Sequence, residues 1–507
     1  MSGILNDLLL GLSVALAPNV LIYALLGCIV GTLVGVLPGL GPLAGMSLLL
    51  PLTFGLSPTT AIVLLAGIYY GAMYGGSTTS ILMRIPGETA SVVTCLDGYE
   101  MARKGRAGPA LAIAALGSFV AGTISVFVLM VVAPQVARFA LKFGPAEYVG
   151  LLTLGLLSLS QLSSGSRLRA MLMSLVGLSL GMIGVDPLSG YARFTFGIHE
   201  LADGLGIVPL AVGGFGISEI LLSAGAKSPP EVRAPRLRDL LPNGEEIRRS
   251  VWPCLRGTCI GFAIGLIPGS AHILSSFASY AVERRVSKHP EEFGKGAVEG
   301  VAGPESANNA AASSAFVPML ALGLPAGAVP AVMLAALMTH GIPPGPKLIQ
   351  QQPHLYWGFV ASMYVGNIVL LILNLPMVGL FVRVLRIPYS ILYPLILVMC
   401  TVGVYSVNSS TADLWIMFAA GGAAYFLRRA DYDVAPAVLG FVLAPMFEMS
   451  LRQAFTLSSG SVSIFIQRPI AATMLALALV LVLLNFWNFF RRILRPQGAE
   501  RISPRVP

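Results

Sequence analysis

Long apolar segments, separated by short breaks, follow one another along most of the chain. The first stretch shows the pattern best, because none of the 76 residues between Asp7 and Arg84 is Asp, Glu, Lys or Arg. About 20 apolar helical residues cross the hydrocarbon core of a bilayer, which is about 30 Å thick, so this stretch is long enough for several passes. Such runs predict an all-α polytopic membrane protein, because a membrane-spanning helix satisfies its own backbone groups in lipid.

Breaks at glycine, proline and polar residues divide these runs into about 12 to 15 predicted membrane segments. The N-terminal half is predicted to hold helices at about 19–37, 58–84, 109–133, 145–160, 168–185 and 205–224, with a return segment from a break at 38–42 to about 54. The C-terminal half is predicted to hold helices at about 251–269, 357–376, 390–405, 413–427, 434–450 and 469–490, a return segment at 270–282 and a broken segment at 305–325. Gly75 and Gly76 are expected to loosen the helix that contains them, and segments 87–108 and 326–341 are expected to be re-entrant or interfacial.

The most polar segment divides the chain almost in half. It spans 225–250 and carries the basic residues Lys227, Arg233, Arg236, Arg238, Arg248 and Arg249. Lys and Arg collect in the cytoplasmic loops of membrane proteins, so this linker and the basic C-terminus are predicted to be cytoplasmic. The predicted units are an N-terminal membrane repeat (1–224), the linker (225–250), a C-terminal membrane repeat (251–468) and a final helix with its tail (469–507).

The two halves resemble each other in sequence. GTLVGVLPG at 31–39 matches GFAIGLIPG at 261–269, and further matches follow in the same order, such as PLAVGGFGISE at 209–219 with PAVLGFVLAPMFE at 436–448. Seven predicted passes in each half is an odd number, so the second half should lie inverted in the membrane. Inverted repeats with broken and re-entrant helices are typical of secondary transporters, whose sites form near the midplane.

Composition and charge narrow the class of protein. Only 11% of the residues are charged, against about 25% in soluble domains, which excludes an ordinary soluble enzyme. The net charge of +9 is expected from cytoplasmic loops, so no nucleic-acid partner is predicted. The cysteines form no CxxC pair and are interpreted as packing residues: Cys28, Cys95, Cys254, Cys259 and Cys400. The five histidines form no HExxH motif and have no GxSxG nucleophile elbow beside them, so we predict neither an enzyme nor a metal centre.

Two motifs of the first half are candidates for binding. VLPGLGPLAG at 36–45 interrupts a helix with proline and glycine, and backbone amides freed at a helix N-terminus bind carboxylates. A simple packing kink is the alternative. GGSTTS at 75–80 offers four adjacent hydroxyls that could bind a cation or a carboxylate. Its alternative is bonding of the hydroxyls to their own helix.

The second half offers two counterparts, LIPGSA at 266–271 and PESANNAAASS at 304–314. Asn308 and Asn309 are costly to bury unpaired, so they predict either a ligand site or a polar clamp between helices. Glu305 is either a coupling-ion site or a cap at the start of its helix. Near the predicted span ends, the residues interpreted as structural are Asp186, Glu219 and the local ion pair of Glu448 with Arg452.

These motifs together resemble a known family. The runs GVLPGLGPLAG, YGAMYGGSTTSILMRIPGE, LDGYEMARKGRAGP, PESANNAAASSAFVPMLALGLPAG and HGIPPGP closely resemble the large membrane subunit of the bacterial tripartite tricarboxylate transporters, and the resemblance extends from about 20 to 470. It implies a cation-driven importer of small carboxylates such as citrate in the inner membrane. It also implies two partners, a small membrane subunit of about four helices and a periplasmic solute-binding protein.

The resemblance also implies where ligand and ion bind. The implied substrate-binding residues are Pro38, Gly39, Leu40, Gly41, Gly75, Gly76, Ser77, Thr78, Thr79, Ser80, Pro268, Gly269, Ser270, Asn308, Asn309, Ser313 and Ser314. The candidates for the coupling ion, Na⁺ or H⁺, are Glu305, Thr79 and Asn308, and no other cofactor is expected. Ser313 and Ser314 replace a Gly-Gly pair of the family motif and add hydroxyls at that position.

Three other functions stay open at this point. A stand-alone carboxylate transporter or a passive channel could also use two similar halves. A membrane-embedded enzyme acting on a lipid would need convergent acids, histidines or a nucleophile, and the charge-poor motifs argue against it.

Overall fold

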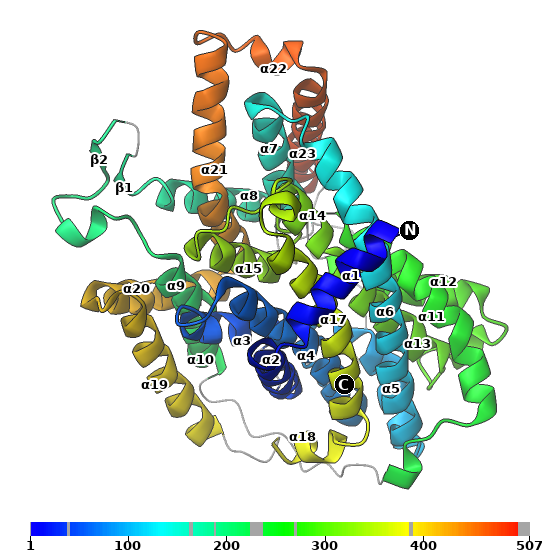
Figure 1. Cartoon of the computed structure of the whole chain (residues 1–507). Helices are drawn as coiled ribbons and strands as arrows, with labels where there is room; N and C mark the ends of the chain where they lie inside the picture. The colour runs from blue at the N-terminus through cyan, green and yellow to red at the C-terminus, as the bar shows by residue number, and fades with distance from the viewer. Residues whose placement is uncertain are drawn as a thin grey trace.

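The computed structural model describes residues 2–37, 41–161, 166–186, 189–223, 237–267, 271–384 and 389–494. The regular structure of these residues is helical, apart from one short antiparallel hairpin of β1 (Gly184–Val185) and β2 (Ala192–Arg193). In Figure 1 the hairpin projects from the body of the molecule, away from the tightly grouped central helices.

The first half contains α1 (Ser2–Ala15), α2 (Pro18–Val36), α3 (Gly41–Leu49), η1 (Leu50–Thr53), α4 (Pro58–Met83), η2 (Thr89–Val92), α5 (Thr94–Arg103), α6 (Ala107–Ala140), α7 (Pro145–Gln161), α8 (Arg167–Leu180), η3 (His199–Leu201), α9 (Ile207–Ala211), the π-helical turn η4 (Val212–Ile217) and α10 (Ser218–Ser223). The second half contains η5 (Leu237–Asp239), α11 (Gly244–Gly265), α12 (Ala271–Val286), η6 (Pro290–Glu292), α13 (Glu299–Ser314), α14 (Phe316–Leu322), α15 (Ala328–Thr339), α16 (Leu348–Gln351), α17 (Pro353–Asn374), α18 (Val378–Val384), α19 (Tyr389–Asn408), α20 (Thr411–Arg429), α21 (Ala435–Leu457), α22 (Ile464–Gln467) and α23 (Pro469–Leu494).

The prediction of an all-α membrane protein is confirmed. Within the described residues, α2, α6, α17 and α21 are each long and apolar enough to cross a membrane, and several shorter helices are also apolar. Most predicted segments coincide with helices within a few residues. The sequence pattern missed α1, and α11 begins at Gly244, inside the predicted linker, where Asn243 and Glu246 form a capping box.

The expected loosening of α4 at its glycine pair is wrong. The helix is continuous from Pro58 to Met83. The two glycines instead allow neighbouring groups to approach α4 closely. A Cβ atom added at Gly75 would lie 2.4 Å from the carbonyl oxygen of Thr32, and one at Gly76 would lie 2.7 Å from the Cγ atom of Glu88. Glycine here admits a neighbouring backbone on one side and a buried acid on the other.

Glycines also bring two helix pairs together in the same way. On α2, Cβ atoms added to Gly27, Gly31 and Gly35 would meet the carbonyl oxygens of Leu64, Ile68 and Ala72 on α4 at 2.3–2.4 Å. On α11, Cβ atoms added to Gly257, Gly261 and Gly265 would meet the carbonyl oxygens of Gly303, Ala307 and Ala311 on α13 at 2.1–2.5 Å. Small residues at four-residue spacing let helix backbones pack closely. The shared packing supports the sequence repeat, while the inverted orientation stays a prediction.

The two central helices, α4 and α13, are the most buried parts of the molecule. Every residue of α13 is buried, as is the stretch of α4 from Thr60 to Ile81. An aromatic cluster joins α4 to two other helices, because Phe316 of α14 packs edge to face against Tyr69 and Tyr70 of α4 and against Phe359 of α17 at centroid distances of 5.1–5.9 Å. Both binding motifs predicted on these helices therefore lie in the protein interior.

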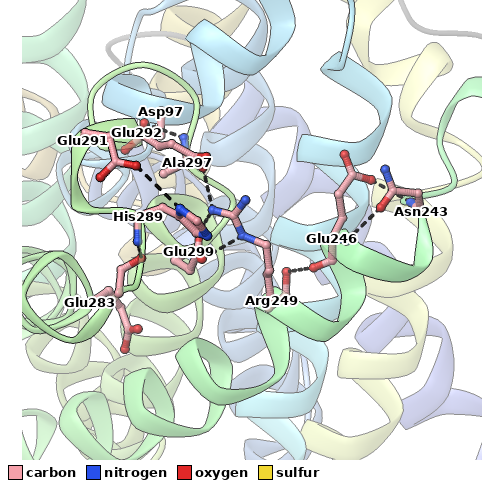
Figure 2. Close-up of polar contacts among 12 residues, drawn as sticks. Asp97, Asn243, Glu246, Arg249, Glu283, His289, Glu291, Glu292, Ala297 and Glu299 are labelled. Atoms are coloured by element: carbon pink, nitrogen blue, oxygen red, sulfur yellow. Dashed lines mark hydrogen bonds and ion pairs between the residues drawn. The ribbon is translucent and has the colours of Figure 1, made fainter.

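A polar cluster holds the start of α13 in place (Figure 2). Asp97 on α5 is buried, and its carboxylate accepts hydrogen bonds from the backbone amides of Gly296 and Ala297 at 2.8 Å. Arg249 on α11 donates to Glu299 at 2.9 Å and to Glu292 at 2.6 Å, and this bond lowers the pKa of the Glu292 carboxyl. The N-terminus of α13 is thus tied to α5 of the first half and to α11 of the second.

Candidate functional site

Glu305 lies in the buried interior of α13, almost two turns after the helix begins at Glu299. Its side chain accepts a hydrogen bond from the hydroxyl of Ser77 on α4 at 2.5 Å and another from Thr94 at the start of α5. The alternative that Glu305 caps its helix at the interface is therefore wrong. A buried acid held by two hydroxyls joins the GGSTTS motif to the second half.

A second buried acid, Glu88, lies beside the first. Its carboxylate accepts hydrogen bonds from the side-chain amide of Asn308 at 3.0 Å and from the backbone amide of Ala90 at 2.7 Å. Asn308 lies three residues after Glu305, so both side chains lie on the same face of α13. Glu88 thus completes a second bridge between the halves.

The end of α2 reaches the same place. Segment 84–88 turns back onto α4, and a Cβ atom added at Gly87 would lie 2.1 Å from the carbonyl oxygen of Gly35 and 2.6 Å from the Cα atom of Gly76. Gly35 lies near the end of α2, one turn before the predicted break. Gly41 begins α3 with a left-handed φ of +60° and has open space around it. The predicted site residues Pro38, Gly39 and Leu40, and their counterparts Pro268, Gly269 and Ser270, lie outside the described residues.

The hydroxyls of the GGSTTS motif have different surroundings. Thr79 and Ser80 both donate to the carbonyl oxygen of Gly76, at 3.1 and 3.0 Å, as the helix-bonding alternative predicts. Ser77 binds Glu305, whereas Thr78 lines a cavity of about 10 Å³, about the size of one water molecule. The motif therefore divides between local helix bonds and the buried site.

The remaining polar residues of α13 extend the network. The side-chain amide of Asn309 donates to Ser118 on α6 at 2.7 Å and to the carbonyl oxygen of Glu305 at 3.1 Å. Ser313 lines a second cavity of about 10 Å³ with Tyr74, whose hydroxyl donates to Asn367 on α17 at 2.6 Å. Ser314 donates to the carbonyl oxygen of Ala311 within its own helix. The structure thus gathers the described site residues of both halves around α4 and α13.

The sequence analysis missed several residues of this network, among them Glu88 and Thr94. Both belong to a segment predicted as re-entrant or interfacial, which carried no binding assignment. The available signal was a single acid that directly follows Ile-Pro-Gly at the end of the charge-poor run. An intramembrane or re-entrant acid is a functional-site hypothesis by default, and Glu88 fits that rule.

The charges on Glu88 and Glu305 have no cationic partner among the described residues. The salt bridges found there join other residues, and neither acid takes part in one. Arg84, the basic residue nearest in sequence to Glu88, is exposed and lies over the ring of Tyr99 at 5.8 Å. The site is therefore buried and rich in oxygen atoms, and its two acids have no paired cation in the part of the chain that the structure describes.

The acids that the sequence analysis assigned to structure do form ion pairs. Arg452 pairs with Glu448 at 2.6 Å and with Asp186 at 2.8 Å, and Glu219 pairs with Arg428 at 2.8 Å. The first two contacts lie on α21 and join it to Asp186, the residue after β1, whereas the third joins α10 to α20. They confirm the structural interpretation of these acids.

The packing interpretation of the cysteines holds for four of the five. All five are free, and Cys259 on α11 is exposed whereas the other four are buried.

Comparisons with known proteins give the family. Residues 21–439 match the family described as "Tripartite tricarboxylate transporter TctA family". The chain is 50% identical over 484 residues to an uncharacterized 52.8 kDa protein of Agrobacterium vitis from the TAR-I ttuC' 3' region, a match that covers 96% of both chains. It is also 50% identical over 224 residues to an uncharacterized protein of the same organism from the TAR-II ttuC' 3' region, covering 44% of this chain and 93% of the relative. No solved structure matches. The motifs, the helical fold and the family match together show that this chain belongs to the tripartite tricarboxylate transporter TctA family, a family of transporters and not of enzymes.

Proposed function

We propose that the chain is the large permease subunit of a tripartite secondary transporter that imports small di- or tricarboxylates, driven by a cation gradient. The family match supports this function. The observation that carries it furthest is the meeting of two motifs from different halves, because Ser77 bonds Glu305 and Asn308 bonds Glu88. Both bonds cross between the halves, so a movement of one half against the other would break or rebuild the site.

The carboxylate would be held by groups that donate hydrogen bonds. Amide side chains and hydroxyls are suitable donors, and Thr78 and Ser313 line small cavities beside the central helices. Backbone amides of the interrupted segments at 38–41 and 268–270 would add further donors. Such a site binds an anion without a dedicated Arg or Lys, which suits a ligand that must also be released.

The proposed complex has two partners. A small membrane subunit of about four helices would complete the permease, and a periplasmic solute-binding protein would deliver the carboxylate. The complex would lie in the bacterial inner membrane with the 225–250 linker and the C-terminus in the cytoplasm. The concentration of basic residues in that linker supports this orientation.

Uptake into membrane vesicles tests the proposal. Vesicles containing the chain and its small partner, supplied with the binding protein and a sodium or proton gradient, should accumulate a labelled di- or tricarboxylate. Asn308→Ala and Thr78→Val should each reduce the initial rate by about tenfold or more, since each removes a polar group from the site and a lost hydrogen bond to a charged group costs about 1.5–3 kcal/mol. Absence of gradient-dependent accumulation for any carboxylate would refute the proposed function.

The same assay separates the alternatives. Accumulation without the binding protein would indicate a stand-alone transporter. Equilibration without accumulation would indicate a channel. Normal uptake by both variants in correctly inserted protein would remove Asn308 and Thr78 from the site.

A further inference from the structure

Two buried carboxyl groups face the same side of α13, and neither has a cation beside it among the described residues. Glu305 is 1% exposed and Glu88 is 5% exposed. An unpaired charge buried in protein is costly, and buried acids are therefore paired, neutralised or bound to a metal ion. Glu88 and Glu305 must therefore be paired with a cation, protonated or bound to a metal ion.

The hydrogen-bond donors around both groups suit the ionised form. Each oxygen of Glu88 accepts from an N–H donor, one from Asn308 and one from Ala90. Each oxygen of Glu305 accepts from a hydroxyl, one from Ser77 and one from Thr94. A carboxylate, which has only acceptors, satisfies all four bonds at once.

An independent observation lies on Asn308. Its side-chain nitrogen donates to Glu88, but its side-chain oxygen is buried and has no hydrogen-bond partner. Most buried polar atoms are hydrogen-bonded, and an atom without a partner is accounted for by strain, a water molecule or an ion. The oxygen belongs to the same planar amide that contacts Glu88, so the missing partner would lie beside the two acids. A proton on Glu88 would not supply this partner while the Asn308 nitrogen occupies that carboxylate.

The geometry points to a sodium ion bound between Glu88, Glu305 and Asn308. The available donors are all oxygens, namely carboxylates, an amide carbonyl and nearby hydroxyls, which suit a hard cation and offer no sulfur or imidazole ligand. A bound cation would balance the buried charge and take up the unpaired amide oxygen. This inference rests on the proposed function for its role, in which sodium would supply the driving gradient. It adds the ion and the residues that hold it.

The position of the ion gives the coupling a physical basis. Glu88 belongs to the first half, whereas Glu305 and Asn308 belong to the second. An ion between them would hold the halves together, and its departure would leave two buried acids to repel each other. Binding and release of sodium would therefore bias the arrangement of the two halves.

Thermal unfolding of the purified full-length chain in lipid nanodiscs tests the site without any substrate or partner. Sodium chloride is titrated at pH 8, with choline chloride keeping the ionic strength constant. A ligand that binds the native state raises the unfolding midpoint with its concentration. We expect the midpoint of the wild type to rise with sodium and to saturate.

Three substitutions should weaken that response: Glu88→Gln, Glu305→Gln and Asn308→Ala. Each should raise the half-saturating sodium concentration by about tenfold or more, the scale of effect seen when groups around a metal are lost. Glu299→Gln is the matched control, because Glu299 is an acid of the same helix whose charge is already paired with Arg249. Its midpoint should still rise with sodium as that of the wild type does. If an acid variant does not fold, the sodium titrations of Asn308→Ala and of the wild type still test whether sodium binds at this site.

Several results would overturn the inference. One is a wild-type midpoint that does not respond to sodium. Another is a response that Asn308→Ala leaves unchanged. A midpoint that rises on acidification but ignores sodium would assign the site to a proton instead. The outcomes are separable from the transport proposal: sodium binding without carboxylate uptake would refute only the proposed function, and uptake without sodium binding would refute only this inference.

Discussion

At the scale of single residues, the two hydroxyl groups that donate to Glu305 differ in how easily the sequence reveals them. Ser77 belongs to a motif that stands out by its four adjacent hydroxyls, whereas Thr94 is one threonine in a segment without a marked pattern. In the structure both donate to the same carboxylate. Their equal role follows from where α5 begins, and not from the residues that surround Thr94 in sequence.

Removing either hydroxyl should weaken the site by a similar amount. Ser77→Ala or Thr94→Val leaves one oxygen of a buried carboxylate without its donor, and a bond to a charged group contributes about 1.5–3 kcal/mol. We expect either change to reduce carboxylate uptake in vesicles by at least about tenfold. Ser179→Ala is a suitable control, because its hydroxyl bonds only to the carbonyl oxygen of Leu175 on an exposed face of α8. Uptake by Thr94→Val at the wild-type rate would show that the hydroxyl of Thr94 does not contribute to transport.

At the scale of elements, glycine determines how closely the central helices approach. The stripes on α2 and α11 place each helix against the backbone of its neighbour, α4 or α13. The two stripes occupy corresponding places in the sequence repeat, so a sequence comparison alone identifies them. Which neighbour each stripe meets is visible only in the folded protein.

Gly261→Ala should destabilise the protein. The added Cβ atom would lie 2.1 Å from the carbonyl oxygen of Ala307, and backbone cannot yield as a side-chain tip can. Overpacking of this kind costs about 1–3 kcal/mol, which should appear as a lower unfolding midpoint. Gly422→Ala on α20 is the matched control, since nothing lies within 4 Å of its added Cβ atom and alanine favours a helix by about 1 kcal/mol. A drop in midpoint as large for Gly422→Ala as for Gly261→Ala would show that packing at the stripe is not the cause.

At the scale of the whole molecule, two groups of helices flank the centre. In Figure 1, α11, α12 and α13 gather on one side, whereas α19 and α20 lie on the opposite side. Segment 84–103, with η2 and α5, connects the α4 side to the start of α13 through Asp97 and to its middle through Thr94. A relative movement of the halves would have to pass through these contacts.

The predicted orientation can be tested on the whole chain in cells. The β-hairpin lies between α8 and α9, and one predicted span (205–224) separates it from the predicted cytoplasmic linker, so we expect it to be periplasmic. Its Tyr191 is 77% exposed. In a chain with its native cysteines replaced, Tyr191→Cys should react with a membrane-impermeant maleimide applied to spheroplasts. Lys227→Cys, in the predicted cytoplasmic linker, should react only after the membrane is opened. The reverse labelling pattern would invert the topology.

Local pattern and composition determined the class of this protein. Long charge-poor runs require helices in a membrane, and the repeated glycine and proline motifs mark the same stretches in both halves. Motifs of this length also identify the family, which the comparison confirms over residues 21–439. These features depend on neighbouring residues or on residue order, so they can be read without any knowledge of contacts.

Only the tertiary structure decided how the site is assembled. Glu88 meets Asn308 across 220 positions of sequence, and Ser77 meets Glu305 across 228. Periodicity reports which face of a helix is apolar but not which distant helix will cover it. The glycine pair alone predicted a loosening at Gly75 and Gly76, although those glycines allow Thr32 and Glu88 to approach an unbroken helix. The energetic cost of a buried acid is set by its surroundings in space, and the packing of α4 against α13 supplies those surroundings.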